Sequence, residues 1–457
     1  MRLTNFLQKD QDLNNFIEKT KRVKNSLITG ANAGAFSLLV KQIVDQLNVP
    51  LILIEENENK AQKVYGELNE IMADGSVQLF PVDATIATQT AVSSPDELSA
   101  RIQTLNFLLS QKAGLVVTTP QALQYKLSKP QNFAASKRVF ASGKEYKLDD
   151  LNNWLVQLGY RRDSLVAKPG EFAIRGDILD IYPLDRENPV RMEFFGDEID
   201  TIKEFDLASQ RSKKELKQVT VAAAQDRVFS AADIKNAAQT ITKLMKDAPA
   251  PEKDVKDHFT EALDELNAGG LPKNYAFLVD FLIKNPSSLL NYLSKDGMVL
   301  LDDWPLINQS VKTVDQQNAG FVDDELKTGA MLPGQELRAN FEQIWSKDTH
   351  HHIYFSLFQR SMGRIRLGQM FNWQTREPEQ FFSQMPLIKT EIESYQKKGQ
   401  TVILQADNKK RSRQMTQTMA EFGLDVPVVS STDLIAGQTQ IVVGSFASGF
   451  VLPSINL

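Results

Sequence analysis

Residues 26–54 read SLITGANAGAFSLLVKQIVDQLNVPLILI, in which two short apolar runs flank a helical stretch. The runs at residues 26–29 and 51–54 have the length and apolar content of buried strands, and apolar residues recur at helical spacing between them. A similar run at residues 114–118 follows further helical segments. Because alternating strands and helices build parallel sheets covered by helices, the sequence predicts an α/β domain, which we assign to residues 1–132.

The rest of the chain predicts a multidomain α/β protein. Residues 133–224 contain one helix and then closely spaced strands with turn residues between them, which favours an inserted antiparallel α+β domain. Residues 225–332 are mostly helical and carry one short apolar run. From the predicted strand at residues 353–358 the α/β alternation returns, so residues 333–457 are expected to form a second, small α/β domain.

Composition excludes several classes of protein. The 457 residues include 42% hydrophobic and 24% charged side chains, which is typical of globular domains, and the net charge of -5 disfavours a strongly basic DNA clamp. The absence of cysteine excludes disulfides, iron–sulfur clusters and thiol catalysis, and fits a cytoplasmic protein. No apolar run reaches the ~18 to 20 residues of a membrane helix. The first 22 residues instead predict an amphipathic docking helix.

A glycine-rich turn at residues 29–37, TGANAGAFS, lies where a phosphate-binding loop would lie, between a strand and a helix. The nucleotide-binding pattern G-x-x-x-x-G-K-[ST] is incomplete, because Gly30 and Gly34 are one residue too close and no Lys precedes Ser37. We find no acidic box downstream, since the acids at residues 323–325 follow no apolar strand. We therefore expect a degenerate loop, with neither nucleotide hydrolysis nor a bound cofactor.

Other candidate chemistry is sparse. The run His350-His351-His352 cannot place all three rings on one metal ion, because neighbours on a strand point to opposite faces, and no spacing of acids singles out a catalytic pair. We expect neither a metal site nor catalytic residues. A basic cluster at a predicted helix start is a candidate nucleic-acid contact, although a solvated helix face is favoured because no aromatic residue interleaves it. The cluster comprises Lys409, Lys410, Arg411 and Arg413.

Residues 190–199 read VRMEFFGDEI, and strand alternation turns Met192 toward the core and both Arg191 and Phe195 toward the outer face. Arg175, in the preceding strand, is also expected to point outward. An exposed aromatic side chain beside arginines is typical of protein–protein hot spots. The alternative, that a neighbouring loop covers Phe195 and the arginines are only solvated, stays open at this point.

Several blocks, in this order, resemble the N-terminal part of the bacterial transcription-repair coupling factor (Mfd) family over essentially the whole chain. Blocks in a fixed order are more specific than one motif. They read GYR at residues 159–161, GEFAIRG at 170–176, ILDIYP at 178–183, RMEFF at 191–195 and GSFASGF at 444–450.

The resemblance implies a module similar to UvrB, the damage-handling subunit of nucleotide excision repair, with a small inserted domain that docks on UvrA. The family's UvrA-binding positions fall on Arg175, Arg191 and Phe195. The family continues into a domain that contacts RNA polymerase and into an ATP- and Mg²⁺-dependent DNA translocase, which would follow Leu457. The resemblance thus implies a non-catalytic adaptor whose polymerase and DNA contacts lie in the missing parts.

Two features argue against UvrB itself, one residue departs from the coupling factor's pattern, and two rival functions stay open. The missing loop Lys is usual for the coupling factor's module, whereas UvrB itself keeps it, and residues 80–94 are too short for the aromatic-rich hairpin of UvrB. Asp177 stands where the family usually has a small residue. The rivals are a UvrB-like or nucleotide-dependent DNA helicase, and a DNA-binding module that uses the cluster at residues 409–413.

Overall fold

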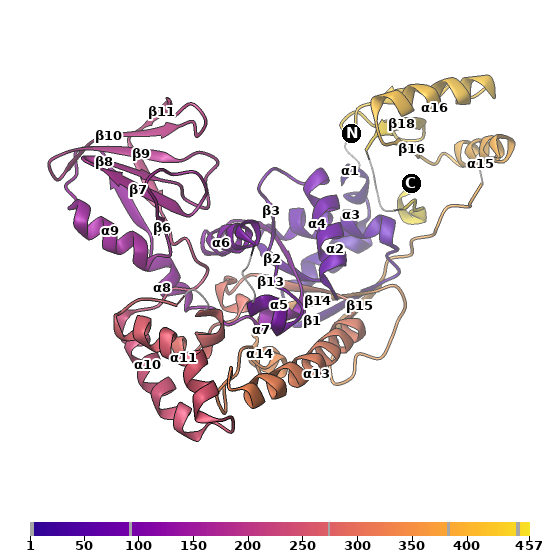
Figure 1. Cartoon of the computed structure of the whole chain (residues 1–457). Coiled ribbons are helices and arrows are strands. Elements are labelled where there is room, and N and C mark those ends of the chain that lie inside the picture. Colours follow the sequence, from indigo (N-terminus) through magenta and orange to yellow (C-terminus); the bar gives the residue numbers. More distant parts are fainter. Residues whose placement is uncertain (1–3, 91–93, 273–274, 382–383, 445–447) are drawn as a thin grey trace.

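The computed structural model describes residues 4–90, 94–272, 275–381, 384–444 and 448–457. Parts of two stretches used above, residues 91–93 and 445–447, lie outside the described residues. The central feature is a seven-stranded parallel sheet with the order β15-β1-β14-β13-β2-β4-β3 (Figure 1). Its strands are β1 (Asn25–Thr29), β2 (Pro50–Ile54), β3 (Val77–Leu79), β4 (Gly114–Thr118), β13 (Met298–Asp302), β14 (His351–Ser356) and β15 (Gln369–Asn372).

Helices cover both faces of this sheet, because its inner strands are apolar on both sides. One face packs against α2 (Gln11–Thr20), α3 (Ala33–Leu47) and α4 (Glu58–Ile71). The other face packs against α6 (Pro95–Leu109), α7 (Pro120–Gln124), α13 (Trp304–Thr328) and α14 (Phe341–Lys347), while the short α5 (Ile86–Thr90) packs against α13. The predicted α/β fold class is confirmed.

The inserted segment forms a six-stranded sheet with the order β11-β10-β9-β8-β7-β6. All its pairings are antiparallel except that of β6 with β7. Its core is continuous with that of the large sheet, since Met192 and Leu105 belong to one buried cluster. The elements are α8 (Pro130–Ala135), β5 (Arg138–Ala141), α9 (Leu148–Gln157), β6 (Arg161–Arg162), β7 (Glu171–Arg175), β8 (Ile178–Ile181), β9 (Val190–Phe195), β10 (Glu198–Phe205), β11 (Ser212–Leu216) and β12 (Gln218–Val221).

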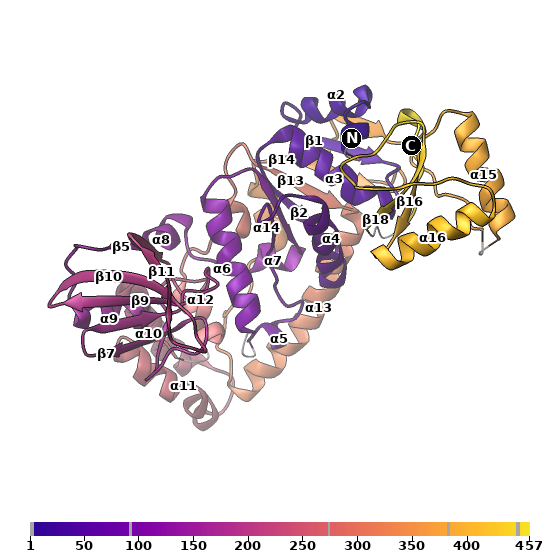
Figure 2. The same ribbon diagram turned by 90° about the horizontal axis from the view of Figure 1, so that it is seen from above.

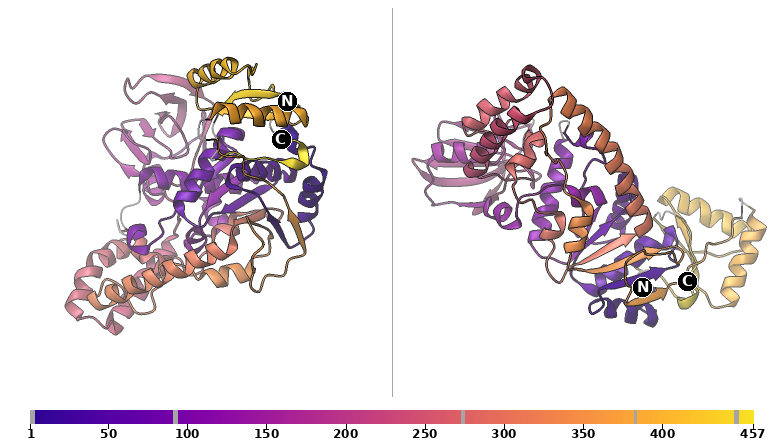
Figure 3. Two further views of the ribbon diagram at one scale, coloured as in Figure 1. Left: turned by 90° about the vertical axis from the view of Figure 1, so that its right-hand side faces the viewer. Right: turned by 90° about the horizontal axis from the view of Figure 1, so that it is seen from below.

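A helical unit follows, with a small apolar core of its own. Its two longer helices pack against each other below the inserted sheet in the view of Figure 1, and Figure 3 shows them from two further sides. The unit comprises α10 (Ala231–Leu244), η1 (Met245–Asp247), α11 (Glu252–Asn267), η2 (Tyr275–Leu278), α12 (Val279–Leu282) and η3 (Leu289–Tyr292).

The C-terminal unit is a three-stranded parallel sheet with the order β16-β18-β17, and Figure 2 shows it at the opposite end of the molecule from the inserted sheet. The strand predicted at residues 353–358 does not belong to it, so that assignment is wrong: β14 lies between β1 and β13 in the large sheet. An apolar run looks the same in either sheet. The unit contains α15 (Met385–Lys397), β16 (Val402–Ala406), α16 (Lys409–Glu421), β17 (Val428–Val429), β18 (Thr439–Val443) and η4 (Pro453–Ile455).

The N-terminal docking segment is two helices, α1 (Thr4–Leu7) and α2, instead of one. Neighbouring residues of α1 reach different units, since Phe6 packs against the C-terminal sheet and Leu7 against the core of the large sheet. The predicted docking is therefore intramolecular. Within the described ranges, no helix has the length and apolarity needed to cross a membrane.

Candidate protein-docking site

The predicted docking residues lie on the outer face of the inserted sheet. β8 runs antiparallel to both β7 and β9, and the register aligns Ala173 with Asp180 and Asp180 with Arg191. Burial alternates along β9 as the sequence predicted, with Met192 fully buried and Phe195 86% exposed. The prediction for this strand is confirmed.

A buried carboxylate joins the two arginines. Asp180 on β8 is fully buried and lies between the strands that carry Arg175 and Arg191. Arg175 donates one hydrogen bond to Asp180 Oδ2 (2.6 Å), and Arg191 donates two, from Nε to Oδ1 (2.7 Å) and from Nη2 to Oδ2 (2.8 Å). Such paired, charge-assisted bonds fix the plane of a guanidinium group. The arginines are thus held in place before any partner binds.

Arg191 is the more enclosed of the two arginines. Its guanidinium lies 4.6 Å from the centre of the Phe205 ring, and its Nη2 also donates to Gln210 Oε1 (3.2 Å). The hydrogen bonds from Arg191 to Asp180 raise the pKa of the guanidinium above its usual value. Its side chain is 16% exposed, against 44% for Arg175. Arg191 therefore points to the outer face, as predicted, but is an integral part of that face.

Phe195 lies at the end of β9, before the turn into β10, and its side chain is open to solvent among the residues that the structure describes. The alternative in which a neighbouring loop covers Phe195 is therefore wrong. β7 and β9 run in the same direction and Arg175 is level with Glu193, so Arg175 and Phe195 both lie at one end of the sheet, about 12 Å apart across two strand spacings and two residues along the strand. The turn at Gly176 and Asp177 is attached to β9, because Phe194 N donates to Asp177 O (2.8 Å).

Charged side chains also lie near Phe195 and the two arginines. Glu193 accepts hydrogen bonds from Lys203 (2.9 Å) and Thr201 (2.7 Å), and these bonds, the one from Lys203 first, lower the pKa of the Glu193 carboxyl. The face therefore offers exposed guanidinium N–H groups beside an uncovered phenyl ring. That arrangement suits a partner surface with a carboxylate next to an apolar pocket.

The predicted degenerate loop contacts other parts of the chain. Gly30 adopts a left-handed φ of 88° after β1, and a Cβ there would meet Asn372 Oδ1 and the carbonyl of Trp373 at 2.7 Å. A Cβ on Gly34 would lie only 2.1 Å from the carbonyl oxygen of Ser448. The start of α3, where phosphates would bind, is thus covered by residues 448–449.

The polar groups of the loop also have protein partners. Asn32 N donates to Thr375 Oγ1 (2.9 Å), and Asn32 Oδ1 accepts from Ala35 N (3.1 Å) to cap α3. Ser37, at the position where Mg²⁺ would be bound, is buried and donates to Glu67 Oε2 (2.6 Å). These contacts support the interpretation of the loop as a structural turn.

The acidic pair that the sequence analysis did not find is Asp302-Asp303. It directly follows the apolar run of β13, and β13 is separated from β1 by β14 alone. Two acids after an apolar run were the sequence signal that could have revealed this pair. Both are engaged by cations, since Asp302 binds Lys60 (2.7 Å) and Asp303 binds Arg360 (3.3 Å). The statement that no acidic box exists is therefore wrong, but this one is occupied by protein cations.

The basic cluster at residues 409–413 begins α16 and lies in the C-terminal unit, far from the inserted sheet (Figure 2). Asn408 caps this helix by accepting from Arg411 N (2.9 Å), and Arg411 also pairs with Asp407 (3.0 Å). Lys409, Lys410 and Arg413 are exposed. The structure does not bring this cluster together with the docking residues.

The histidines have structural partners. His350 and His352 both bind Asp348, at 2.6 and 2.7 Å, and His351 bonds to Thr20 O (2.8 Å). These contacts explain the three consecutive rings without a ligand. Among the described residues, no three metal-binding side chains converge on a common point.

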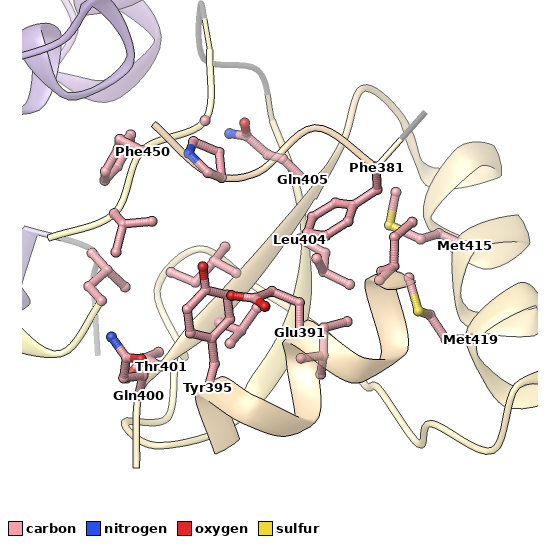
Figure 4. A pocket seen from close by; sticks show the side chains of 18 of the residues that line it. Phe381, Glu391, Tyr395, Gln400, Thr401, Leu404, Gln405, Met415, Met419 and Phe450 are labelled. Atoms are coloured by element: carbon pink, nitrogen blue, oxygen red, sulfur yellow. The ribbon is translucent and has the colours of Figure 1, made fainter. Parts of the chain in front are cut away.

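A cavity of about 490 Å³ lies in the C-terminal unit, between α15, β16, α16 and residues 448–451. Figure 4 shows that Phe381, Tyr395, Met415 and Met419 point into it. Burial and a hydrogen bond with Glu391 raise the pKa of Tyr395 to about 12. The cavity is mainly apolar and belongs to a different unit from the docking residues.

Comparison with known proteins agrees with the sequence blocks. Residues 139–226 match the family model described as the UvrB interaction domain. The transcription-repair-coupling factor of Bacillus subtilis is 28% identical over 460 residues, which cover 99% of this chain and 39% of that protein. That of Staphylococcus aureus is 26% identical over 468 residues, covering 100% of this chain and 39% of that protein. The resemblance is thus confirmed, and the chain spans less than two fifths of the length of these relatives.

Proposed function

We propose that this chain is a UvrA-docking adaptor in transcription-coupled nucleotide excision repair. In this role Arg175, Arg191 and Phe195 present the contact surface. RNA polymerase and a DNA-translocating motor would be reached through parts found in the longer relatives. The chain would recruit a repair factor without performing chemistry itself.

One observation carries this proposal: Phe195 is 86% exposed beside two arginines held by one buried carboxylate. Aromatic residues and arginine are enriched in protein–protein interfaces, so their combination on one exposed face supports a docking role. This feature lies inside the segment that matches the UvrB interaction domain, residues 139–226. The two longer relatives are transcription-repair-coupling factors by name, which supports the pathway.

We also propose that the chain neither binds nor hydrolyses ATP, which disfavours the UvrB-like helicase alternative. The support is steric and electrostatic. Ser448 covers the start of α3 at Gly34, and Asp302 is paired with Lys60 instead of being available to a metal ion. A nucleotide would have to displace both contacts.

The test is the affinity of the 457-residue chain for UvrA, measured by titration calorimetry or surface plasmon resonance. Phe195→Ala is expected to weaken binding by ~2 to 4 kcal/mol, in the range of hot-spot residues. Phe358→Ala is the matched control, because Phe358 is also exposed, at 65%, but lies outside the inserted sheet. Equal affinity of the Phe195 variant and the parent would refute the docking role of this surface.

A further inference from the structure

A second charged surface lies where the strands of the large sheet begin. It is formed by residues 21–24, which precede β1, and by residues 362–368, which precede β15. Because β1 and β15 are parallel neighbours, their starts meet at one edge (Figure 1). Asn25 Nδ2 donates to Arg366 O (3.0 Å) and Gly368 N donates to Asn25 O (2.9 Å), so the two loops are fixed side by side.

Three arginines of these loops are exposed: Arg22, Arg364 and Arg366. Among the residues that the structure describes, none of the three guanidinium groups has a carboxylate partner. Lys21 differs because it pairs with Glu18 (2.9 Å), and Lys24 differs because its ammonium bonds to the carbonyls of Asp348 and His350. We call Arg22, Arg364 and Arg366 the amino-edge patch.

The local charge is strongly one-sided. Residues 349–376 contain four arginines and no Asp or Glu, although the whole chain has a net charge of -5. Of the acids near these loops in sequence, Glu18 is paired with Lys21, and Asp348 is buried between His350 and His352. The field at this edge is therefore positive and is not cancelled by nearby acids.

The chemistry of the patch favours phosphate groups on a regular backbone. Guanidinium groups bind phosphate through paired hydrogen bonds. Single-stranded nucleic acid needs aromatic platforms for its bases, and neither loop contains an aromatic residue. A duplex exposes phosphates without requiring stacking.

We propose that the amino-edge patch binds the phosphate backbone of duplex DNA without reading its sequence. The choice of DNA among polyanions rests on the proposed role in DNA repair. This surface is separate from the docking residues of the inserted sheet and from the cluster at residues 409–413, which lies on α16. A chain bound to UvrA through Phe195 could thus hold DNA at the same time.

The test uses the full chain and a fluorescein-labelled 30-base-pair duplex, with anisotropy recorded from low to moderate salt. We expect the triple substitution of the patch by alanine to weaken binding at least tenfold. The variant loses three phosphate contacts. The slope of the logarithm of the binding constant against the logarithm of the salt concentration should therefore become shallower by about 2.7, at ~0.9 per phosphate. The variant combines Arg22→Ala, Arg364→Ala and Arg366→Ala.

Two matched variants accompany it. The first replaces the exposed Lys235, Lys243 and Lys253 on α10 and α11 by alanine and removes the same charge elsewhere. The second replaces Lys409, Lys410 and Arg413. Both are expected to bind DNA like the parent, and all variants are expected to retain the parent's affinity for UvrA.

The proposal is overturned if the parent does not bind the duplex, if the patch variant binds like the parent, or if either matched variant loses as much affinity. Binding to anionic lipid vesicles but not to the duplex overturns it as well. If the triple variant melts at a lower temperature than the parent, the single variant Arg364→Ala replaces it as the test of DNA binding. Its salt slope is expected to be shallower than the parent's by about 0.9. Loss of UvrA binding in the Phe195 variant is measured separately, so the two proposals fail independently.

Discussion

Arg191 binds Asp180 through two parallel hydrogen bonds, although Arg191 faces the outer side of the sheet and Asp180 is fully buried. The strand pairing of β8 with β9 places the two residues directly opposite each other. The arginine thus has two roles at once: it offers N–H groups to a partner and neutralises a buried carboxylate. A substitution at this position changes both binding and stability.

We predict that Arg191→Ala lowers the free energy of unfolding by about 2 to 4 kcal/mol, since it leaves the buried charge of Asp180 with Arg175 as its one remaining cation. Urea denaturation measures the loss, and Arg191→Ala combined with Asp180→Asn should recover part of it. Full stability of the single variant would show that Asp180 does not depend on this bond.

The neighbouring phenylalanines of β9 should respond in opposite ways. Phe194 is 6% exposed and Phe195 is 86% exposed. Phe194→Ala is expected to cost about 3 to 5 kcal/mol of stability through a core cavity, whereas Phe195→Ala should change it by less than ~0.5 kcal/mol. Thermal melting of both variants checks this. Similar losses in the two variants would mean that Phe195 is packed in solution.

The contrast between these residues shows what the sequence could reveal. The faces of Arg191 and Phe195 followed from the two-residue period of a strand, which needs no knowledge of neighbouring strands. The role of Asp180 depends on the register of two hairpins, and in the sequence it is one acid within an apolar run. Likewise, the position of β14 in the large sheet depends on long-range pairing that an apolar run does not encode.

Two glycines on adjacent helices provide a further test of the covered loop. Gly34→Ala on α3 should destabilise the protein by about 1 to 3 kcal/mol, because its Cβ would lie 2.1 Å from Ser448 O. Gly66→Ala on α4 is the matched control, since no atom lies within 4 Å of its Cβ position, and it should stabilise by up to ~1 kcal/mol. Urea denaturation compares them. Equal effects would mean that residues 448–449 do not rest on α3.

The carboxyl edge of the large sheet should make stability depend on pH. Burial first, and then the charge of Asp302, raise the pKa of Glu55 well above its usual value. A carboxyl that binds its proton more tightly in the folded state loses stability as pH rises from its unfolded value of about 4.3 toward the folded pKa. Glu55→Gln resembles the protonated form. Its stability relative to the parent should therefore increase with pH.

Denaturation of Glu55→Gln and the parent at pH 4.5, 6 and 8 measures this difference. The control is Glu261→Gln, which alters an exposed carboxylate on α11. A difference between Glu55→Gln and the parent that stays constant across the three pH values would contradict the raised pKa.

The last prediction concerns how the C-terminal unit is held. Because β14 and β15 belong to the large sheet, the exposed connection to α15, residues 376–380, is the expected site of limited proteolysis by a glutamate-specific protease. The nicked chain should nevertheless elute as one species in size-exclusion chromatography. Leu452, from the C-terminal fragment, is buried in the core of the large sheet, and Phe6, from the N-terminal fragment, is buried against the C-terminal sheet.

Phe6 and Leu452 hold the two fragments together at separate points. Weakening one of these contacts should therefore not release the fragments, whereas weakening both should. Phe6→Ala and Leu452→Ala are each expected to leave the nicked species intact, and the double variant is expected to separate into two peaks. The apolar area of two large side chains, at about 25 cal/mol per Å², is enough to shift a docking equilibrium of this kind. Separation of the nicked parent chain without denaturant would show that the units are joined by the connection alone.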